Sequence, residues 1–319
     1  MSLVFIGTPE FAVPSLRGLY AAGHEISAVV TQPDRPAGRG RLLAPSPVKV
    51  AAVELGLPVI QPESLRDANS VNQLRRLSPE LMVAVAYGQI LRRNVLEIPE
   101  RGVLNVHPSL LPLYRGASPI PAAILAGDDE TGVTIMLMDE GMDTGPMLAQ
   151  RRALISPQDT AGSLAESLAE LGAHLLVETL PKWLVGHITP ERQDSSAATV
   201  TRPLKKQDGA IDWSLPAVEI WRTVRGYNPW PGAHTQLNSE LVHIWSAWPI
   251  ETDSGAGPGV VVTIPPTAPV EATAAAFAVQ TGSGLLSVLE AQRSGRKRLP
   301  SDELLRGMPD LVGKHLGLR

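Results

Sequence analysis

The chain has 319 residues, of which 44% are hydrophobic, and a formal net charge of −4 at pH 7. This length can supply two domains, each with its own hydrophobic core. The acidic balance excludes a polycation, so any contact with nucleic acid must come from local basic patches. The absence of cysteine excludes disulfides, thiolate zinc sites and cysteine nucleophiles.

Strand-like and helix-like segments alternate through the first half of the chain. Buried-strand patterns occur at residues 3–6, 26–31, 59–60, 81–86 and 102–107. Helix patterns occur at residues 14–22, 47–55 and 71–77. A β-α-β rhythm of this kind predicts an α/β fold with a mostly parallel sheet and right-handed crossovers.

The same alternation continues further along the chain. Ser118 and Pro119 open a helix that we expect to end near Gly127. Residues 133–138 and 147–155 predict two more strands. Ser163 to Glu166 match a capping box, which predicts that a helix starts there.

A second domain is indicated after residue 190. Residues 191–206 are polar and without apolar periodicity, which predicts a linker. Beyond them, a helix from Ser214 to about Arg225 precedes five short strand patterns, which suggest a small β-barrel. We expect domains at 1–189 and 207–319 with a linker at 190–206. Five tryptophans are expected in the core of the second domain: Trp213, Trp221, Trp230, Trp245 and Trp248.

Polar residues at the end of the strand at 102–107 indicate a reactive site. Because strand side chains alternate between faces, Asn105 and His107 point the same way. Ligands bind at that end of the strands in open α/β sheets. Asp143 lies in a loop between glycines, which lets its carboxylate come close. An amide with a His–Asp pair suits reactions that build charge on a carbonyl oxygen while a proton moves.

Each of these signals also has an ordinary structural explanation. Asn105 and His107 alone are typical of a satisfied polar pair, and Asp143-Thr144-Gly145 alone is typical of a turn. Their combination with the apolar loop Leu110-Leu111-Pro112 favours a functional site.

Several other classes of site and protein lack their motifs. The G-x-G-x-x-G spacing of a dinucleotide loop is absent after Gly7, so we expect no NAD. None of the seven histidines pairs with another at metal-ligand spacing on one helix, so we expect no metal. The absence of G-x-S-x-G weakens a serine hydrolase hypothesis. No signal-peptide pattern or membrane-spanning apolar run is present, so we expect a bacterial-type cytoplasmic protein without membrane contact.

Basic residues gather in three places along this acidic chain. Each cluster alone is typical of a polar surface, but together they predict a positive track that could hold phosphates. The residues that we assign to it are Arg35, Arg39, Arg41, Lys205, Lys206, Arg296, Lys297 and Arg298.

Several motifs resemble those of the formyltransferases that use 10-formyltetrahydrofolate. The core motifs are Asn105-Val106-His107, Ser109-Leu110-Leu111-Pro112, Arg115-Gly116 and Asp143-Thr144-Gly145. The segments from Arg35 to Gly40 and from Asn228 to Gly232 resemble the branch of this family that acts on aminoacylated tRNA. The resemblance covers nearly the whole chain.

The resemblance implies a Rossmann-like formyltransferase fold followed by a small barrel of the oligonucleotide-binding type. It implies Asn105, His107 and Asp143 as catalytic residues, with 10-formyltetrahydrofolate as co-substrate beside Ser109, Leu110, Leu111 and Pro112. The implied partner is initiator methionyl-tRNA, without an obligate protein partner.

Two alternatives remain at this stage. One is a formyltransferase for a small amine, such as a nucleotide sugar or glycinamide ribonucleotide. The other is a non-catalytic RNA-binding protein that has kept the fold.

Overall fold

The computed structural model describes residues 2–37 and 42–317. The chain divides into two compact units. Unit 1 comprises Met1–Pro119, Glu130–Leu154 and Ala165–Arg202, and unit 2 comprises Ile120–Asp129, Ile155–Leu164 and Pro203–Arg319. The domain boundaries expected at 1–189, 190–206 and 207–319 stay a prediction.

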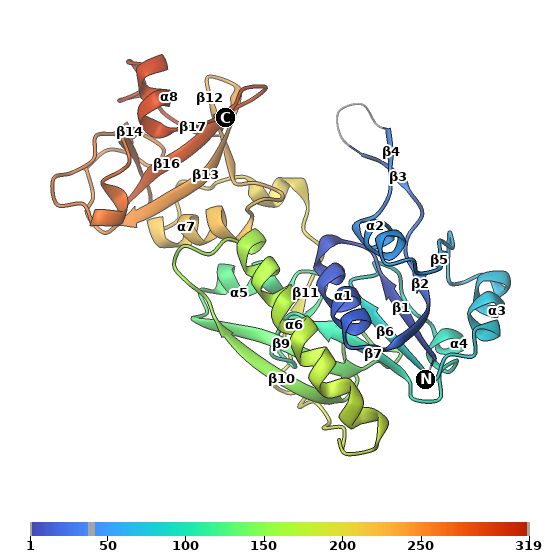
Figure 1. The fold of residues 1–319 in the computed structure, drawn as a ribbon. Helices are drawn as coiled ribbons and strands as arrows, with labels where there is room; N and C mark the ends of the chain where they lie inside the picture. Colours follow the sequence, from blue (N-terminus) through green and yellow to red (C-terminus); the bar gives the residue numbers. More distant parts are fainter. Residues whose placement is uncertain (1, 38–41, 318–319) are drawn as a thin grey trace. The chain divides into compact units, whose positions relative to one another are not determined.

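A seven-stranded sheet forms the centre of unit 1 (Figure 1). In the order β10-β9-β7-β6-β1-β2-β5, its strands are β10 (Met147–Leu154), β9 (Glu130–Leu137), β7 (Val103–His107), β6 (Leu81–Val85), β1 (Ser2–Gly7), β2 (Glu25–Val30) and β5 (Val59–Ile60). β7, β6, β1, β2 and β5 pair in parallel, whereas β9 is antiparallel to β7 and to β10. The expected Rossmann-like, mostly parallel sheet is confirmed.

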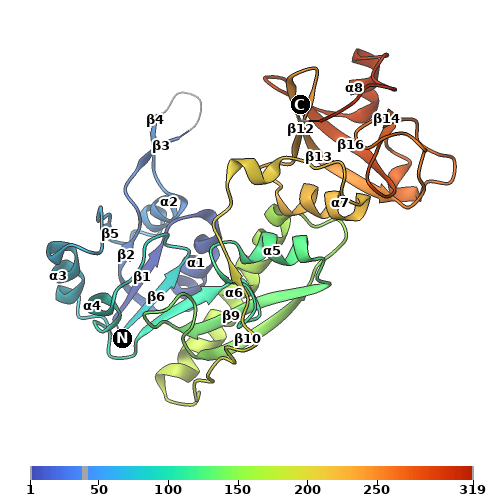
Figure 2. The same ribbon diagram turned by 180° about the vertical axis from the view of Figure 1, so that it is seen from behind.

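Helices cover this sheet, as Figures 1 and 2 show from opposite sides. They are η1 (Glu10–Ala12), α1 (Val13–Ala21), α2 (Pro47–Glu54), α3 (Ala68–Arg76), α4 (Arg93–Leu96) and most of α6 (Ala161–Leu184), whereas α5 (Pro119–Ala126) falls almost wholly in unit 2. Val71 and Leu74 of α3 share one buried cluster with Val4 and Ile6 of β1 and with Met82 of β6. Burial of the sheet by helices explains why its strands are nearly continuous apolar runs.

The start of α6 differs from the sequence prediction. The helix begins at Ala161, two residues before the segment that matches a capping box. Its reciprocal cap joins Thr160 and Ser163, where each backbone N–H donates to the other's hydroxyl at 3.0 and 3.1 Å. Ser163 therefore acts inside the first turn and not as the cap.

The segment that contains the first basic cluster forms a hairpin. β3 (Arg35–Ala37) pairs antiparallel with β4 (Leu42–Ala44). Arg35 is exposed on β3. Arg39 and Arg41, which we assigned to a phosphate track, lie outside the described residues.

Unit 2 is built on a curled, antiparallel half-barrel, which confirms the expected small barrel. Its strands follow the order β12-β13-β16-β15-β14, with β17 also paired to β16. They are β12 (His234–Leu237), β13 (Glu240–Ile250), β14 (Val261–Val262), β15 (Phe277–Gln280), β16 (Leu285–Arg293) and β17 (Arg298–Pro300). Four short helices accompany them: η2 (Lys206–Gly209), α7 (Ala217–Gly226), η3 (Val270–Ala272) and α8 (Ser301–Gly307).

The tryptophans of unit 2 do not share one environment. Trp213 is 5% exposed and belongs to the core with Val242 and Ile244. Trp230 is 56% exposed, and Trp245 is only half-buried on a strand whose core positions are Val242 and Ile244. The expectation that all five tryptophans lie in the core is wrong for these two.

Two features are absent from the described part of the chain. None of its helices is both long and apolar enough to cross a membrane. Residues 2–37 and 42–317 also contain no cluster of three or more histidine, aspartate or glutamate side chains that could hold a metal ion.

Candidate active site

The carboxyl end of β7 carries the two polar residues singled out from the sequence. Leu104 and Val106 are buried in the sheet, and the alternation of strand side chains places Asn105 and His107 on one face. Asn105 is half-buried, whereas His107 is only 4% exposed. A polar ring at this depth needs partners, because an unpaired buried polar group is costly.

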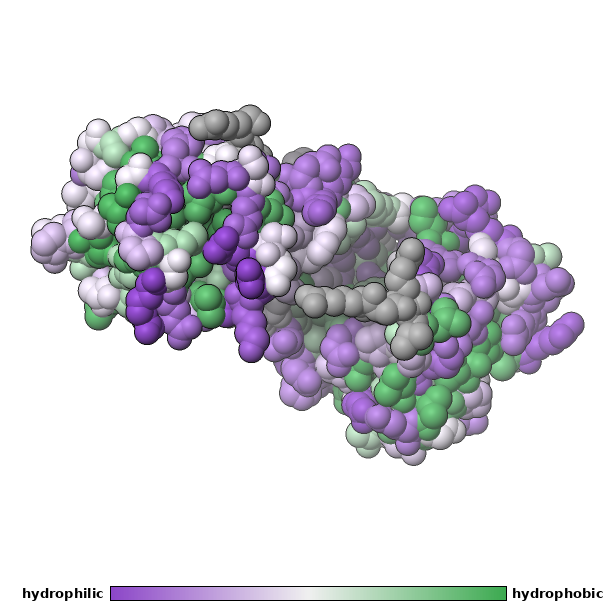
Figure 3. Space-filling model, turned by 90° about the horizontal axis from the view of Figure 1, so that it is seen from above, coloured by the Kyte–Doolittle hydropathy of each residue, from purple (hydrophilic) through white to green (hydrophobic). Residues whose placement is uncertain are grey.

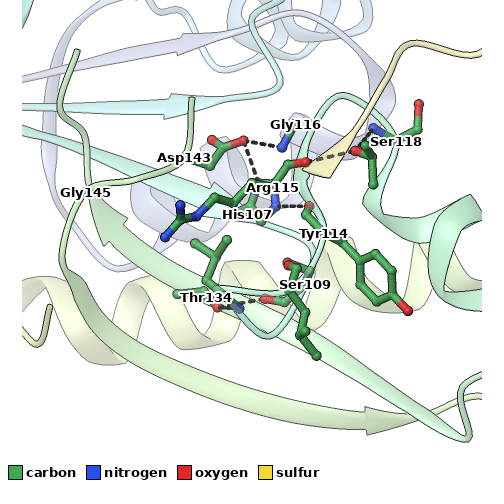
Figure 4. A network of polar contacts seen from close by, with 12 residues as sticks. His107, Ser109, Tyr114, Arg115, Gly116, Ser118, Thr134, Asp143 and Gly145 are labelled. Carbon is green, nitrogen blue, oxygen red and sulfur yellow. Dashed lines mark hydrogen bonds and ion pairs between the residues drawn. The ribbon is translucent and has the colours of Figure 1, made fainter. Parts of the chain in front are cut away.

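His107 has a partner for each ring nitrogen (Figure 4). Its Nε2 lies 3.0 Å from the backbone oxygen of Tyr114, and its Nδ1 lies 3.7 Å from Oδ2 of Asp143. A carbonyl oxygen can only accept, so Nε2 carries the hydrogen and donates it to Tyr114. In the neutral ring, the unprotonated Nδ1 therefore faces the carboxylate.

The charge state of His107 is decided by burial. Loss of water around the ring lowers the pKa of His107 below its ordinary value, and this effect outweighs the Asp143 carboxylate and the Tyr114 carbonyl, which both raise it. His107 is therefore a neutral imidazole at neutral pH. A negative charge that develops nearby would favour its protonation.

Asp143 is held in place by the backbone around it. Its φ of +54° lies in the left-handed region, and Oδ2 accepts a hydrogen bond from the backbone N–H of Gly116 at 2.8 Å. Two residues on, a Cβ at Gly145 would lie 1.9 Å from the backbone oxygen of Leu137, so only glycine fits. The Thr144 hydroxyl also donates to the Asp139 carboxylate at 2.7 Å. The loop therefore presents Asp143 in one position.

A residue that the sequence analysis missed fastens this loop from outside. Gln193 donates through Nε2 to the backbone oxygens of Asp143 and Gly145, at 2.8 and 2.7 Å. Its Oε1 accepts from Nε of Arg115 at 3.0 Å. Arg115 is 7% exposed, and its Nη2 has no hydrogen-bond partner among the described residues.

The stretch around Gln193 packs along the site over several residues. β11 (Val200–Thr201) pairs in parallel with β8 (Arg115–Gly116). The Thr199 hydroxyl accepts from the backbone N–H of Tyr114 at 2.7 Å, which fixes the residue whose carbonyl binds His107. Little in the sequence marks Gln193 and Thr199 as contacts of the site, because isolated polar residues without periodicity are also typical of a linker.

The loop Ser109-Leu110-Leu111-Pro112 uses its polar groups internally. Ser109 is fully buried and donates to the backbone oxygen of Leu113 at 2.6 Å. Thr134 of β9 donates to the Ser109 carbonyl at 2.7 Å and accepts from the Leu111 N–H at 3.1 Å. Leu110 and Pro112 are half-buried. The loop is therefore a rigid apolar element, and its contact with a folate stays a prediction.

A hollow of about 510 Å³ is lined in part by the residues that precede Asp143 in the sequence. Its walls come from α4, the start of β7, the end of β9 and the residues before Asp143. They are Arg93, Leu96, Glu97, Gly102, Leu137, Met138, Asp139, Glu140 and Gly141. Pockets for small-molecule ligands typically measure about 300–1,000 Å³ and are largely apolar. The hollow has the size for a folate-like molecule, and the sequence analysis did not single it out.

The predicted phosphate contacts are exposed wherever the structure describes them. Arg35 belongs to unit 1, whereas the other five belong to unit 2: Lys205, Lys206, Arg296, Lys297 and Arg298. Arg298 forms an ion pair with Glu290. Whether these side chains contact nucleic acid stays a prediction.

Comparisons with known proteins agree with this fold. The family model for formyl transferases matches residues 1–180, and the model for the formyl transferase C-terminal domain matches residues 203–309. The chain belongs to the formyl transferase family. It is 51% identical, over 97% of both chains, to the methionyl-tRNA formyltransferase of Chloroflexus aggregans.

Solved structures of more distant proteins show the same fold. An N-formyltransferase from Helicobacter canadensis, in complex with folinic acid and dTDP-3-aminofucose, superposes with a TM-score of 0.64 at 18% identity. That match covers 90% of this chain and 98% of the other. HypX from Aquifex aeolicus, in complex with tetrahydrofolic acid, has a TM-score of 0.61 at 19% identity. The match covers 98% of this chain but 48% of HypX, so this chain spans about half of that protein.

Proposed function

We propose that the protein transfers the formyl group of 10-formyltetrahydrofolate to the free amino group of methionyl initiator tRNA. The product would be N-formylmethionyl-tRNA for translation initiation. The observation that carries this proposal is the 51% identity, over 97% of both chains, with an enzyme named for that reaction. The folate ligands of two proteins with the same fold support a folate donor.

The reaction needs a held oxyanion and a path for one proton. The methionyl amine attacks the formyl carbon, and the bond from that carbon to N10 of the folate breaks as the amine loses a proton and N10 gains one. In our proposal, the Asn105 amide donates a hydrogen bond to the developing oxyanion, and His107, whose Nε2–H binds the Tyr114 carbonyl, donates from Nδ1 once the developing negative charge has drawn a proton onto that nitrogen. Asp143, 3.7 Å from His107, orients the ring and accepts the amine proton through water.

The donor folate would occupy the hollow beside the Asp143 loop; Leu110 and Pro112 do not line this hollow, so their contact with the donor stays a separate prediction from the sequence. Leu137 and Met138 supply apolar surface there, and Arg93 supplies a cation for the acidic tail of a folate. Arg93 is ion-paired with Glu97 at 2.6 Å in this structure, so binding would exchange one carboxylate for another. Residues at this hollow thus add to the donor contacts expected from the sequence.

The acceptor tRNA would be held largely through its phosphates. Arg35 of the β3–β4 hairpin and the cations of unit 2 are exposed, as phosphate contacts require. We propose the same phosphate contacts for Arg39 and Arg41, on the basis of the sequence alone. Affinity for tRNA should therefore fall as salt is added.

The decisive experiment supplies the full chain with 10-formyltetrahydrofolate and methionyl initiator tRNA and assays formylmethionine. A parallel reaction offers an amino nucleotide sugar or glycinamide ribonucleotide as acceptor. Formylation of the tRNA alone supports the proposal, and formylation of the small amine alone contradicts it. Tight tRNA binding without transfer by either route would make the protein a non-catalytic RNA-binding member of the family.

A further inference from the structure

A row of flat side chains crosses the outer face of the half-barrel of unit 2. The strand register places His234 opposite His243, His243 opposite Gln292, and Gln292 opposite Arg298. Directly opposed residues project from the same face of a sheet, so the four form a row across β12, β13, β16 and β17. Trp245 follows His243 two positions along β13, on the same face.

The rings of this row touch one another in sequence. The centroids of His234 and His243 lie 5.5 Å apart. His243 and Trp245 are stacked at 5.3 Å with 13° between their planes, and Cζ of Arg298 lies 5.5 Å from the Trp245 centroid. Nε1 of Trp245 donates to Oε1 of Gln292 at 2.9 Å, which fixes the indole against the sheet. The result is a pre-ordered aromatic cluster, in which His234 is buried and His243 and Trp245 are half-buried.

The core of the half-barrel does not require this row. Val242 and Ile244, which alternate with His243 and Trp245, supply the packing against the core. Gly232 lies close beneath the rings, because a Cβ there would sit 3.0 Å from Nδ1 of His243 and 3.2 Å from the Trp245 ring. That Nδ1 is buried and has no hydrogen-bond partner among the described residues. Such an arrangement is costly unless it serves binding.

The charge around the row suits a polyanion. The exposed cations of unit 2 near it in sequence or register are Lys205, Lys206, Arg296, Lys297 and Arg298. The acidic residues of β16 and β13 are already paired, Glu290 with Arg298 and Glu240 with Arg293. Figure 3 shows strongly hydrophilic residues around a hydrophobic patch on one face of unit 2; its colours give hydropathy, and the charges are those of the residues named above. Stacked rings bordered by cations are how oligonucleotide-binding barrels hold single strands.

We propose that the row His243, Trp245 and Arg298, backed by the buried His234, holds an unpaired stretch of the acceptor RNA, and that phosphate bound there draws a proton onto His243. A base lies against Trp245, and the adjoining phosphates face Lys206 and the His243 imidazole. This inference rests on the proposed function, because it takes the acceptor to be an RNA.

The proton coupling follows from the charges that face His243. These are His234 from β12 and Lys206 from η2, whereas Arg298, paired with Glu290, lies over Trp245. Burial lowers the pKa of His243, and His234 and Lys206 lower it further. A phosphate reverses this effect and raises the pKa in the complex. RNA affinity should therefore rise as pH falls through the raised pKa and level off below the pKa of the free protein.

The first test separates stacking from hydrogen bonding at Trp245. Trp245→Leu and Trp245→Phe both lose the bond to Gln292, but only the phenylalanine variant keeps a ring. Full-length proteins are titrated with a short single-stranded oligoribonucleotide and with a duplex of the same sequence. We expect Trp245→Leu to bind the single strand about tenfold more weakly or worse, Trp245→Phe to recover most of that loss, and duplex binding to change little. Equal losses in both variants would overturn the stacking role.

The second test addresses the proton. Single-strand affinity is measured at constant ionic strength from about pH 5.5 to 8, where histidine titrates. We expect the affinity of the unmodified protein to rise toward low pH and that of His243→Gln to stay flatter. The control His187→Gln alters an exposed histidine of unit 1 and should keep the full rise. A His243→Gln profile that matches the unmodified protein would overturn the coupling.

Formyl transfer keeps the two proposals apart. If the row binds single strands as expected but no formylmethionyl-tRNA forms, the proposed function fails and the row stands. If tRNA is formylated at the same KM and kcat by Trp245→Leu as by the unmodified protein, the function stands and the row fails. Support for both requires a raised KM for tRNA with nearly unchanged kcat.

Discussion

Gln193→Leu should disable the site without touching any of the three proposed catalytic side chains. Leucine has nearly the volume of glutamine but no polar atoms. The change removes two hydrogen bonds to the backbone oxygens of Asp143 and Gly145 and one from Arg115. The two backbone oxygens and Nε of Arg115 then lack a hydrogen-bond partner in a half-buried place. Nη2 of Arg115 has no partner even in the unmodified protein, among the described residues.

The magnitude follows from the number of contacts. Hydrogen bonds contribute about 0.5–1.5 kcal/mol each to stability, so three together hold the loop by roughly 2–3 kcal/mol. At about 1.4 kcal/mol per factor of ten, complete transfer of that loss to the chemical step corresponds to a decrease of roughly 30- to 150-fold in kcat. The bond from Gly116 to Asp143 remains, so the decrease should stay within that bound.

The assay is single-turnover formyl transfer beside thermal unfolding and tRNA binding. We expect a slower chemical step, a lower Tm and unchanged tRNA affinity. Ser195→Ala, on an exposed residue of the same stretch, is the matched control and should behave like the unmodified protein. A Gln193→Leu protein with normal kcat and Tm would refute the idea that this side chain fastens the Asp143 loop.

Three further predictions concern the same site. Asp143→Asn should slow single-turnover transfer by about 100-fold or more while tRNA affinity stays within a factor of two or so; the reverse pattern would make Asp143 a binding residue. Because the pKa of buried His107 lies below its ordinary 6.5, the unfolded chain takes up the proton first, and the free energy of unfolding should fall as pH drops below 6.5 until the lowered pKa is passed. His107→Gln should make this fall shallower in urea titrations across pH, and an unchanged slope would count against a buried neutral ring. Gly145→Ala should destabilise the protein by about 1–3 kcal/mol, since its Cβ would meet the Leu137 carbonyl, whereas Gly257→Ala meets no atom within 4 Å and should leave stability and transfer intact.

The sequence predicted the sheet well because its strands are long apolar runs between helix signals. β5 matches its expected range, β1 and β2 differ by one residue at each end, and β6 differs by one residue at one end. The predicted start of α6 was wrong because Thr160 and Ser163 form the reciprocal cap. Ser163 and Glu166 match the sequence pattern of a capping box without forming the cap. β17 and α8 escaped prediction, since a strand of three residues and a helix of seven residues give little periodicity.

The polar residues of the candidate site could be picked out from the sequence, but the contacts that hold them in position could not. Asn105, His107 and Asp143 stand out because they interrupt apolar or glycine-rich segments. Tyr114 acts through its backbone oxygen, so its side-chain identity carries no signal of that contact. Gln193 acts across 50 residues from Asp143, a distance that no local pattern records.

The pairing of β11 with β8 sets the order in which the site can be completed during synthesis. A nascent chain that has emerged to residue 190 already contains all seven strands of the larger sheet. It still lacks Gln193, Thr199 and Thr201, whose contacts fasten the residues around Asp143 and Tyr114. Tyr114 and Thr199 are 85 positions apart, so this closure must wait until the distal segment leaves the ribosome. A product that terminates at residue 190 would thus form its sheet but lack the contacts that hold the Asp143 loop and Tyr114 in position.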